Sequence, residues 1–503
     1  MMHAPLVALV AIALAAVAAR LPSPPRAAQD HAPPARARPP ADAPNFVLVT
    51  MDTTRADHLG CYGYPRPTTP NIDRLAAESV VFENCHSTVT ITTPSHTSIL
   101  TGTWPFEHGV TNFAFNSDRE KTEARRFEPI DRLRTITQHL ADQGWRTGGF
   151  VTAATTKKST GLAVGFDSWT EPDEPVRFGA EATRDALEWL ATVEPPFFLW
   201  LHYFDPHKPP REQNQQYVDT FAGDAALRAL LAERGIRKEG KGATNLEKQV
   251  AWYDAGLRRI DDCFGDLRTR LEQRGFWPRT TVLIVGDHGE GLAQHDVMSH
   301  GPVWREGTHV PFVLRLPGVA PERVPTLVST IDAVATAVAN TPGLPGEAFL
   351  AQASGKNVLA ADFEPRAVFT MSPARRGDYS IHVGRWHLIR LQDGTRSLFD
   401  VERDPHELDD LAEKEPQIAN VLERQLLQMV QEHRSRHVEL YGEVDGKTGP
   451  DAAELRRQIE ELAKLGYTEE GGDDLLPDAD DGDGESGDDA DGGKTGDDDG
   501  ASR

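Results

Sequence analysis

The chain is 503 residues long, which is enough for a large α/β core with a smaller second domain. Its 77 acidic residues outnumber the 53 Lys and Arg residues, and this net charge of −24 argues against nucleic acid as a partner, because phosphates would be repelled. Three cysteines (Cys61, Cys85 and Cys263) exclude a disulfide framework, while nine Trp and 20 Phe favour a globular enzyme over a filament.

The N-terminal segment predicts export. Residues 1–21 contain an apolar, Ala-rich stretch that is too short to span a bilayer comfortably and is rich in the small residues that suit signal-peptide cleavage. An uncleaved membrane anchor over residues 4–20 is the alternative. The Pro- and Ala-rich residues 22–43 are predicted to be a linker. We therefore expect a periplasmic or extracellular protein.

Two apolar runs far apart in the sequence end in acidic residues. Residues 45–50 are rich in β-branched side chains and lead to Asp52, and residues 281–286 lead to Asp287 and His288. Such runs are typical of buried parallel strands, whose carboxyl ends bind ligands in open α/β sheets. Two strand ends that each deliver a carboxylate indicate a hard-cation site. The alternative for either motif alone is an ordinary turn and cap.

The segment 92–102 predicts a helix that begins beside a reactive alcohol. Pro94 suits the first turn of a helix and Gly102 suits its end. We expect Thr92 just ahead of the helix N-terminus, where free amides and the helix dipole favour an anionic oxygen. A metal-coordinated Thr92 alcohol could be deprotonated to attack phosphorus or sulfur. The alternative is that Thr92 is an ordinary helix cap.

A histidine-rich motif follows the aromatic run at residues 198–201. His202, Asp205 and His207 admit three interpretations. They form a polar loop with one capping Asp, or a histidine contacts the transferred group and protonates the leaving oxygen. In the third interpretation they build a second metal site together with His300. The residue pattern leaves these alternatives open.

The remaining elements predict the architecture. Apolar runs, including one at residues 312–316, alternate with helical stretches at residues 131–142, 180–192 and 246–274. This alternation predicts a large, mostly parallel sheet flanked by helices. Residues 468–503 carry fifteen acidic and two basic residues with almost no apolar ones, so this tail is predicted to be disordered. Solubility and charge repulsion are its expected roles.

Taken together, these motifs resemble the sulfatase family within the alkaline phosphatase superfamily. The resemblance spans about residues 44 to 466 and is carried by residues 49–59, 68–76, 92–102, 198–207, 286–290 and 397–401. It implies an alkaline phosphatase-like α/β catalytic domain over residues 44–345 and a smaller C-terminal α+β subdomain over residues 346–467. It also implies a divalent ion (Ca, Mg, Mn or Zn) held by Asp52, Thr92, Asp287 and His288. The implied catalytic residues are Thr92, His96, His202, His207 and His300.

The chain also departs from this family at its catalytic positions. The family makes its nucleophile by oxidising Cys or Ser to formylglycine, but oxidation of Thr92 would give a ketone and not an aldehyde. Thr53 replaces the second Asp of the first metal motif, His96 replaces the signature Arg, and His300 replaces a Lys. The family's other Lys would fall at residues 150–153, where none is present. The site is therefore richer in histidine than one built for a sulfate monoester.

The expected activity is metal-dependent hydrolysis of a sulfate ester or related oxyanion ester, with Thr92 as the nucleophile. The substrate would be a sulfated or phosphorylated small molecule or glycan. Hydrolysis of a phosphodiester or phosphonate monoester, or phosphoglycerol transfer, is the alternative within enzymes. An alternative from another class is a catalytically silent glycan-binding protein.

Overall fold

The computed structural model describes residues 37–112, 126–207, 215–221, 225–236, 240–373 and 377–442. The expected signal or anchor segment, most of the linker and the acidic tail lie outside these residues. Within the described ranges, no helix combines the length and the apolar composition needed to cross a membrane.

A large mixed sheet forms the centre of the molecule. Its neighbouring strands are parallel except β7, which is antiparallel to both β6 and β2. Strands β1, β5 and β6 are buried along their whole length, which explains their continuous apolar runs. This arrangement confirms the expected fold class. In spatial order the eight strands are β4 (Ser168–Thr170), β3 (Arg146–Phe150), β5 (Phe197–Tyr203), β1 (Asn45–Met51), β6 (Thr280–Gly286), β7 (Phe312–Arg315), β2 (Val80–His86) and β8 (Glu322–Ser329).

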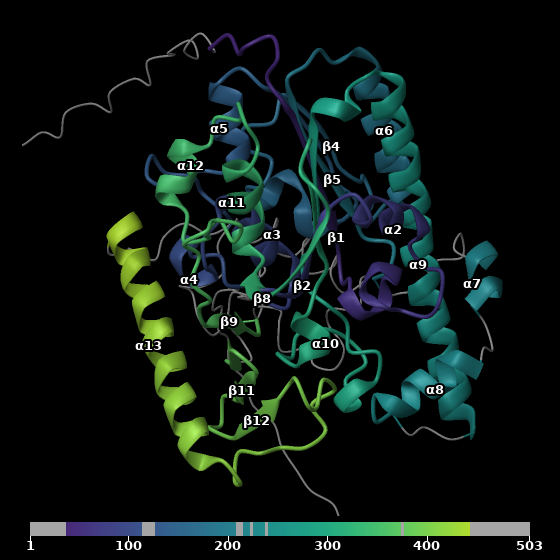
Figure 1. Cartoon of the computed structure of the whole chain (residues 1–503), viewed down its shortest axis with the longest axis vertical. Coiled ribbons are helices and arrows are strands. Elements are labelled where there is room, and N and C mark those ends of the chain that lie inside the picture. Colours follow the sequence, from purple (N-terminus) through teal and green to yellow (C-terminus); the bar gives the residue numbers. More distant parts are fainter. Residues whose placement is uncertain are drawn as a thin grey trace, which may run out of the picture.

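Helices cover both faces of this sheet (Figure 1). Val47 and Val49 of β1 pack toward one core, and Phe46 and Leu48 pack toward the other, as the two-residue period of a strand requires. The first core is covered by α2 (Pro70–Ala76), α6 (Gly179–Thr192) and α9 (Gly240–Gln273). The second is covered by α3 (Thr92–Thr101), α5 (Ile136–Asp142), α11 (Ile331–Ala339) and α12 (Glu347–Gln352).

Two of these helices differ from the predicted boundaries. Helix α5 begins at Ile136 because Thr135 caps it, accepting a hydrogen bond from Gln138 N at 3.3 Å. Helix α9 begins six residues before the predicted start at residue 246. Short helices complete the layers: α4 (Pro105–His108), α7 (Gln215–Phe221), α8 (Ala225–Glu233) and α10 (Arg305–Thr308). The three cysteines are free thiols, as expected.

A second, antiparallel sheet lies toward the C-terminus. Its strands are β9 (Val368–Met371), β10 (Tyr379–Val383), β11 (Trp386–Arg390) and β12 (Arg396–Asp400). Helix α13 (Pro416–Tyr441) packs against this sheet through Ala419, Leu422 and Leu426. The preceding helix α12 still belongs to the large sheet, because Phe349 is buried in the second core. The expected small C-terminal α+β unit is thus present.

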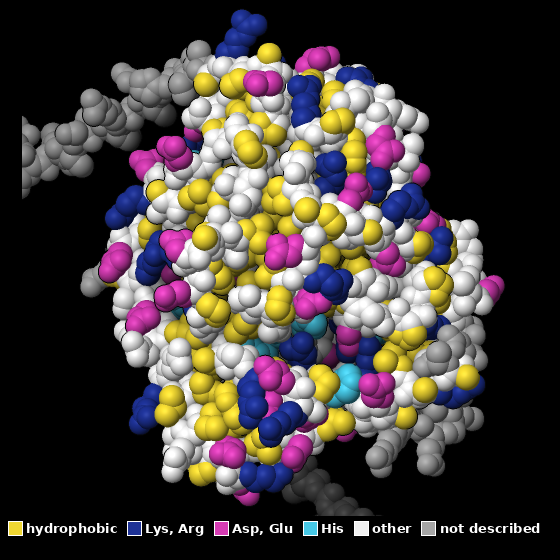
Figure 2. All heavy atoms as spheres, in the orientation of Figure 1, with side chains coloured by type: hydrophobic (Ala, Val, Ile, Leu, Met, Phe, Trp, Pro, Cys, Tyr) yellow, Lys and Arg dark blue, Asp and Glu magenta, His cyan; other side chains and the backbone are white. Residues whose placement is uncertain are grey.

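The surface in the same orientation mixes acidic and basic side chains (Figure 2). Histidine side chains gather in the lower half of this face, in the part of the view where Figure 1 places α10. This region lies near the carboxyl ends of the central parallel strands.

Candidate active site

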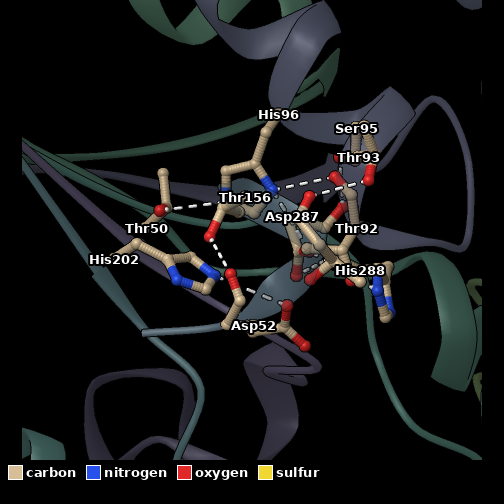
Figure 3. A network of polar contacts seen from close by, with 12 residues as sticks. Thr50, Asp52, Thr92, Thr93, Ser95, His96, Thr156, His202, Asp287 and His288 are labelled. Atoms are coloured by element: carbon tan, nitrogen blue, oxygen red, sulfur yellow. Dashed lines mark hydrogen bonds and ion pairs between the residues drawn. The ribbon is translucent and has the colours of Figure 1, made fainter. Parts of the chain in front are cut away.

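Three predicted metal ligands meet at the carboxyl edge of the large sheet. Strands β1 and β6 are adjacent and parallel, with Met51 opposite Gly286, so the residues that follow them are brought together. Ligand atoms of Asp52, Asp287 and His288 lie within 4.8 Å of one another, and all three residues are buried. Figure 3 shows these side chains and Thr92 pointing toward one another. The predicted convergence is confirmed.

The hydrogen bonds of Asp287 and His288 leave two acceptors facing each other. Asp287 Oδ1 accepts hydrogen bonds from Thr53 N at 3.1 Å and His288 N at 2.7 Å. His288 Nδ1 donates to Gly289 O at 3.0 Å, so His288 Nε2 carries the lone pair of the neutral ring. The His288 Nε2 atom lies 3.4 Å from Asp287 Oδ2, and neither atom has a hydrogen-bond partner among the residues that the structure describes. A proton or a cation between them is needed to make this contact favourable.

Burial makes the charges of this cluster costly. It raises the pKa of Asp52, and it raises the pKa of Asp287 well above its usual value, an effect that the neighbouring Asp52 carboxylate increases. Burial and the nearby His300 lower the pKa of His288 to about 3. Neither oxygen of Asp52 has a hydrogen-bond partner of normal geometry. Two carboxylates and one neutral imidazole with unused lone pairs are a donor set that fits a divalent cation.

Helix α3 places Thr92 beside this cluster. The helix begins at Thr92 itself, and not after it as predicted, because Ile91 is extended and its carbonyl already accepts a hydrogen bond from Ser95 N at 3.3 Å. The Thr92 hydroxyl interacts with the Asp52 carboxylate and counteracts part of the rise in its pKa. Ser95 Oγ donates to Asp287 O at 2.7 Å, which fixes the helix start to the second metal motif.

His96 is held in one neutral tautomer. Its Nδ1 donates to Thr92 O at 2.8 Å, and its Nε2 accepts from Thr50 Oγ1 at 3.0 Å. Thr50 Oγ1 in turn accepts from Trp200 Nε1 at 2.9 Å. Burial and the neighbouring His202 lower the pKa of His96 to about 3. At neutral pH His96 therefore supplies no positive charge in place of the family's Arg, and its hydrogen bond fixes the Thr92 carbonyl.

His202 lies behind Asp52. Thr152 N donates to His202 Nδ1 at 3.3 Å, so the ring proton is on Nε2, which lies 3.5 Å from Asp52 Oδ2. Burial lowers the pKa of His202 to about 3, and the positive charge of Arg177 adds to this effect. The imidazole thus faces the Asp52 carboxylate, one of the predicted metal ligands.

His207 and His300 lie on the other side of the cluster. The His300 ring lies 4.7 Å from that of His288 and 5.0 Å from that of His207, which stacks on Phe204 at 4.1 Å. Glu290 was not predicted as a site residue, although it belongs to the same motif as Asp287. Its Oε2 is buried without a hydrogen-bond partner and lies 3.5 Å from His300 Nδ1.

The loop after β6 depends on a glycine between these residues. Gly289 N donates to Gly307 O at 2.8 Å, and a Cβ at position 289 would lie 1.9 Å from Glu306 O. No other residue allows the loop to approach α10 this closely. The spacing of Asp287, His288 and Glu290 in the site therefore depends on this contact.

Comparisons with known proteins agree with the fold and the site. A model of the sulfatase family matches residues 44–343. The ulvan-active sulfatase of Formosa agariphila is 24% identical over 81% of this chain and 86% of its own, and the endo-4-O-sulfatase of Bacteroides thetaiotaomicron is 24% identical over 65% and 74%. The phosphonate monoester hydrolase of Agrobacterium radiobacter has a similar structure, with a TM-score of 0.59, 19% identity and coverage of 78% of this chain and 96% of its own. Because the family model matches more than half of the sequence, the chain belongs to the sulfatase family and is an ester hydrolase of that family.

Proposed function

We propose that this protein hydrolyses sulfate esters of glycans, using a divalent metal held by Asp52, Asp287, His288 and Thr92, with Thr92 as the nucleophile. The observation that carries the proposal is the facing pair of His288 Nε2 and Asp287 Oδ2, two acceptors 3.4 Å apart beside the Thr92 alcohol. With two carboxylates, one alcohol and one imidazole, the donor set suits Mn²⁺ or Zn²⁺ better than Ca²⁺, which takes six to eight oxygen ligands.

A bound divalent cation would supply the positive charge that this site lacks and would lower the pKa of a coordinated alcohol. Thr92 lies in the first turn of α3, whose free amides favour an anionic oxygen. Its Oγ1 releases its proton to solvent and forms a bond to sulfur while the bond from sulfur to the glycan oxygen breaks. His207 or His300 donates a proton to that leaving oxygen. Water then cleaves the threonyl sulfate, which releases sulfate and restores the Thr92 hydroxyl.

The choice of a glycan rests on the relatives. The ulvan-active sulfatase is named for activity on ulvan, and it aligns over most of both chains. The predicted export of this chain supports the same assignment, because a protein outside the cytoplasm can reach polymeric substrates directly. We therefore propose a secreted or periplasmic enzyme, with its N-terminal segment as a signal peptide or an anchor.

A second candidate substrate is a phosphodiester or phosphonate monoester. It is favoured by the histidines at the site. Burial lowers the pKa of His96, His202 and His288 to about 3, so these side chains are neutral at pH 7 and do not supply the positive charge that a site built for a sulfate monoester has. A threonine nucleophile also cannot provide the aldehyde on which the family's usual sulfatase chemistry depends. The fold shared with a phosphonate monoester hydrolase is consistent with this alternative.

A substrate panel on metal-reconstituted protein tests the proposal. The protein is stripped with a chelator, loaded with Mn²⁺, Zn²⁺, Mg²⁺ or Ca²⁺, and assayed with sulfated oligosaccharides, 4-nitrophenyl sulfate, bis(4-nitrophenyl) phosphate and a phenylphosphonate ester. We expect sulfate release with Mn²⁺ or Zn²⁺, and none from Asp287→Asn under the same conditions. Faster turnover of the phosphorus esters would select the second candidate. Metal binding with no turnover of any ester would indicate a silent glycan-binding protein.

A further inference from the structure

The turn that follows β1 has an unusual backbone conformation at Thr53. Its φ of +50° lies in the left-handed region, which β-branched residues rarely adopt. Thr53 immediately follows Asp52, and its N–H donates to Asp287 Oδ1 at 3.1 Å. The left-handed turn therefore joins the two strand ends that carry the carboxylates. Such a conformation persists only where the surrounding structure holds it in place.

One side chain of helix α9 holds this turn. Tyr253 lies on α9 and is 3% exposed. Its hydroxyl donates to Thr53 O at 2.8 Å and accepts from Arg55 N at 2.9 Å. One phenol oxygen thus satisfies two buried main-chain groups on either side of Thr54. Without it, both groups would be buried without a partner.

The clamped turn also contacts the loop that follows β6. The Arg55 side chain, which is 2% exposed, donates to Glu290 O at 3.2 Å and to Gly291 O at 3.4 Å. Asp57 and Gln294 also hold the Arg55 guanidinium, whereas Tyr253 holds the Arg55 main chain through its N–H. Tyr253 is therefore connected through Thr53 to Asp287 and through Arg55 to the segment that carries Glu290.

We propose that Tyr253 is a positioning residue of the metal centre, acting through the left-handed turn at Thr53. This inference rests on the proposed metal site. Tyr253 hydrogen-bonds main-chain groups and not the metal-ligand side chains, so its contribution is to hold Asp52 and the Thr53 N–H in register with Asp287. Loss of a hydrogen-bond partner outside the ligand set of a metal site typically weakens metal affinity about 10–100-fold.

The test is Tyr253→Phe, which removes one oxygen and keeps the ring. Its matched control is Tyr62→Phe, because the Tyr62 hydroxyl also bridges two main-chain groups, accepting from Phe312 N at 2.7 Å and donating to Phe82 O at 3.0 Å. That bridge joins β7 and β2 and includes no main-chain group of the turn at Thr53. Metal affinity of chelator-stripped protein is measured by calorimetry with Mn²⁺ and Zn²⁺. We expect about 10–100-fold weaker binding for Tyr253→Phe and unchanged binding for Tyr62→Phe.

Hydrogen exchange of the metal-free protein provides a readout that does not depend on the metal. The amides of Thr53 and Arg55 should exchange faster in Tyr253→Phe than in wild type, and at the wild-type rate in Tyr62→Phe. Unchanged exchange of both amides, or equal metal affinity of Tyr253→Phe and Tyr62→Phe, would overturn the positioning role. If wild-type protein binds no divalent ion, the proposed function fails, while the exchange rates still decide whether Tyr253 holds the turn.

Discussion

Thr92 combines two features that a helix cap alone does not explain: its hydroxyl faces the Asp52 carboxylate, and it begins a helix tied to Asp287 through Ser95. We predict that Thr92→Ala loses several orders of magnitude in kcat, because the nucleophile and one ligand disappear together. Thr92→Ser should retain part of the activity, since serine keeps the oxygen and only loosens its rotamer. Steady-state kinetics at measured metal content check this. Near-normal activity of a metal-loaded alanine variant would limit Thr92 to a structural role at the start of α3 and leave Ser95 or a bound water as the nucleophile.

The chemistry of a secondary alcohol gives a second prediction for the same residue. Oxidation of Thr92 cannot yield an aldehyde, so the purified protein should show an unmodified peptide across residues 87–98 in mass spectrometry. The neutral, fully hydrogen-bonded His96 agrees with a site that does not use the family's usual nucleophile. An aldehyde at any residue of that peptide would contradict this prediction.

At the scale of single elements, the end of α3 depends on a glycine. Gly102 has a φ of +67°, and a Cβ there would lie 2.9 Å from Ala353 Cβ and 3.1 Å from Phe349 Cζ. Gly275, after α9, has the same φ of +67° with nothing within 4 Å of its would-be Cβ. Gly275→Ala should therefore cost about 1 kcal/mol of unfolding free energy from backbone strain alone. Gly102→Ala should cost about 1–3 kcal/mol more from the added contact. Urea denaturation measures the unfolding free energy of both variants. Equal losses for the two would show that α12 shifts to accommodate the methyl group.

The sequence predicted the strands and the meeting of Asp52, Asp287 and His288 because each of those signals is local. An apolar run followed by Asp52, or by Asp287 and His288, is visible in a few residues, and parallel strands must bring such ends to one edge. The role of Tyr253 could not be predicted, because it lies about 200 residues from the turn that it holds. The left-handed Thr53 was likewise hidden, since its conformation results from contacts with α9 and Asp287 and not from its own preference.

At the scale of the whole molecule, a column of buried and partly buried histidines joins the large and the small sheet. His86 of β2 lies 5.5 Å from His309 and 3.8 Å from His382 of β10, measured between ring centroids. His382 stacks on His387 of β11 at 3.7 Å, and His387 Nδ1 shares a hydrogen bond with Glu407 Oε1. Arg305 Nη1 lies 3.5 Å from His86 Nε2. A positive charge on His86 or His382 would be buried near the Arg305 guanidinium, which makes the junction between the sheets sensitive to acid.

Unfolding free energy should therefore fall on acidification. Burial lowers the pKa of His86 and His382 well below 6.5, and burial with the nearby Arg305 lowers that of His309 to about 3. Below pH 6.5 the unfolded chain binds protons that these folded histidines do not, so each costs about 1.4 kcal/mol per pH unit until its folded pKa is reached. His382→Phe keeps a ring in the column and removes one such group. Urea midpoints at pH 7, 6 and 5 should show its unfolding free energy falling about 1.4 kcal/mol per pH unit less steeply than wild type between pH 6 and 5. Parallel pH profiles for the two proteins would mean that His382 is protonated in the folded state or that the column opens before it titrates.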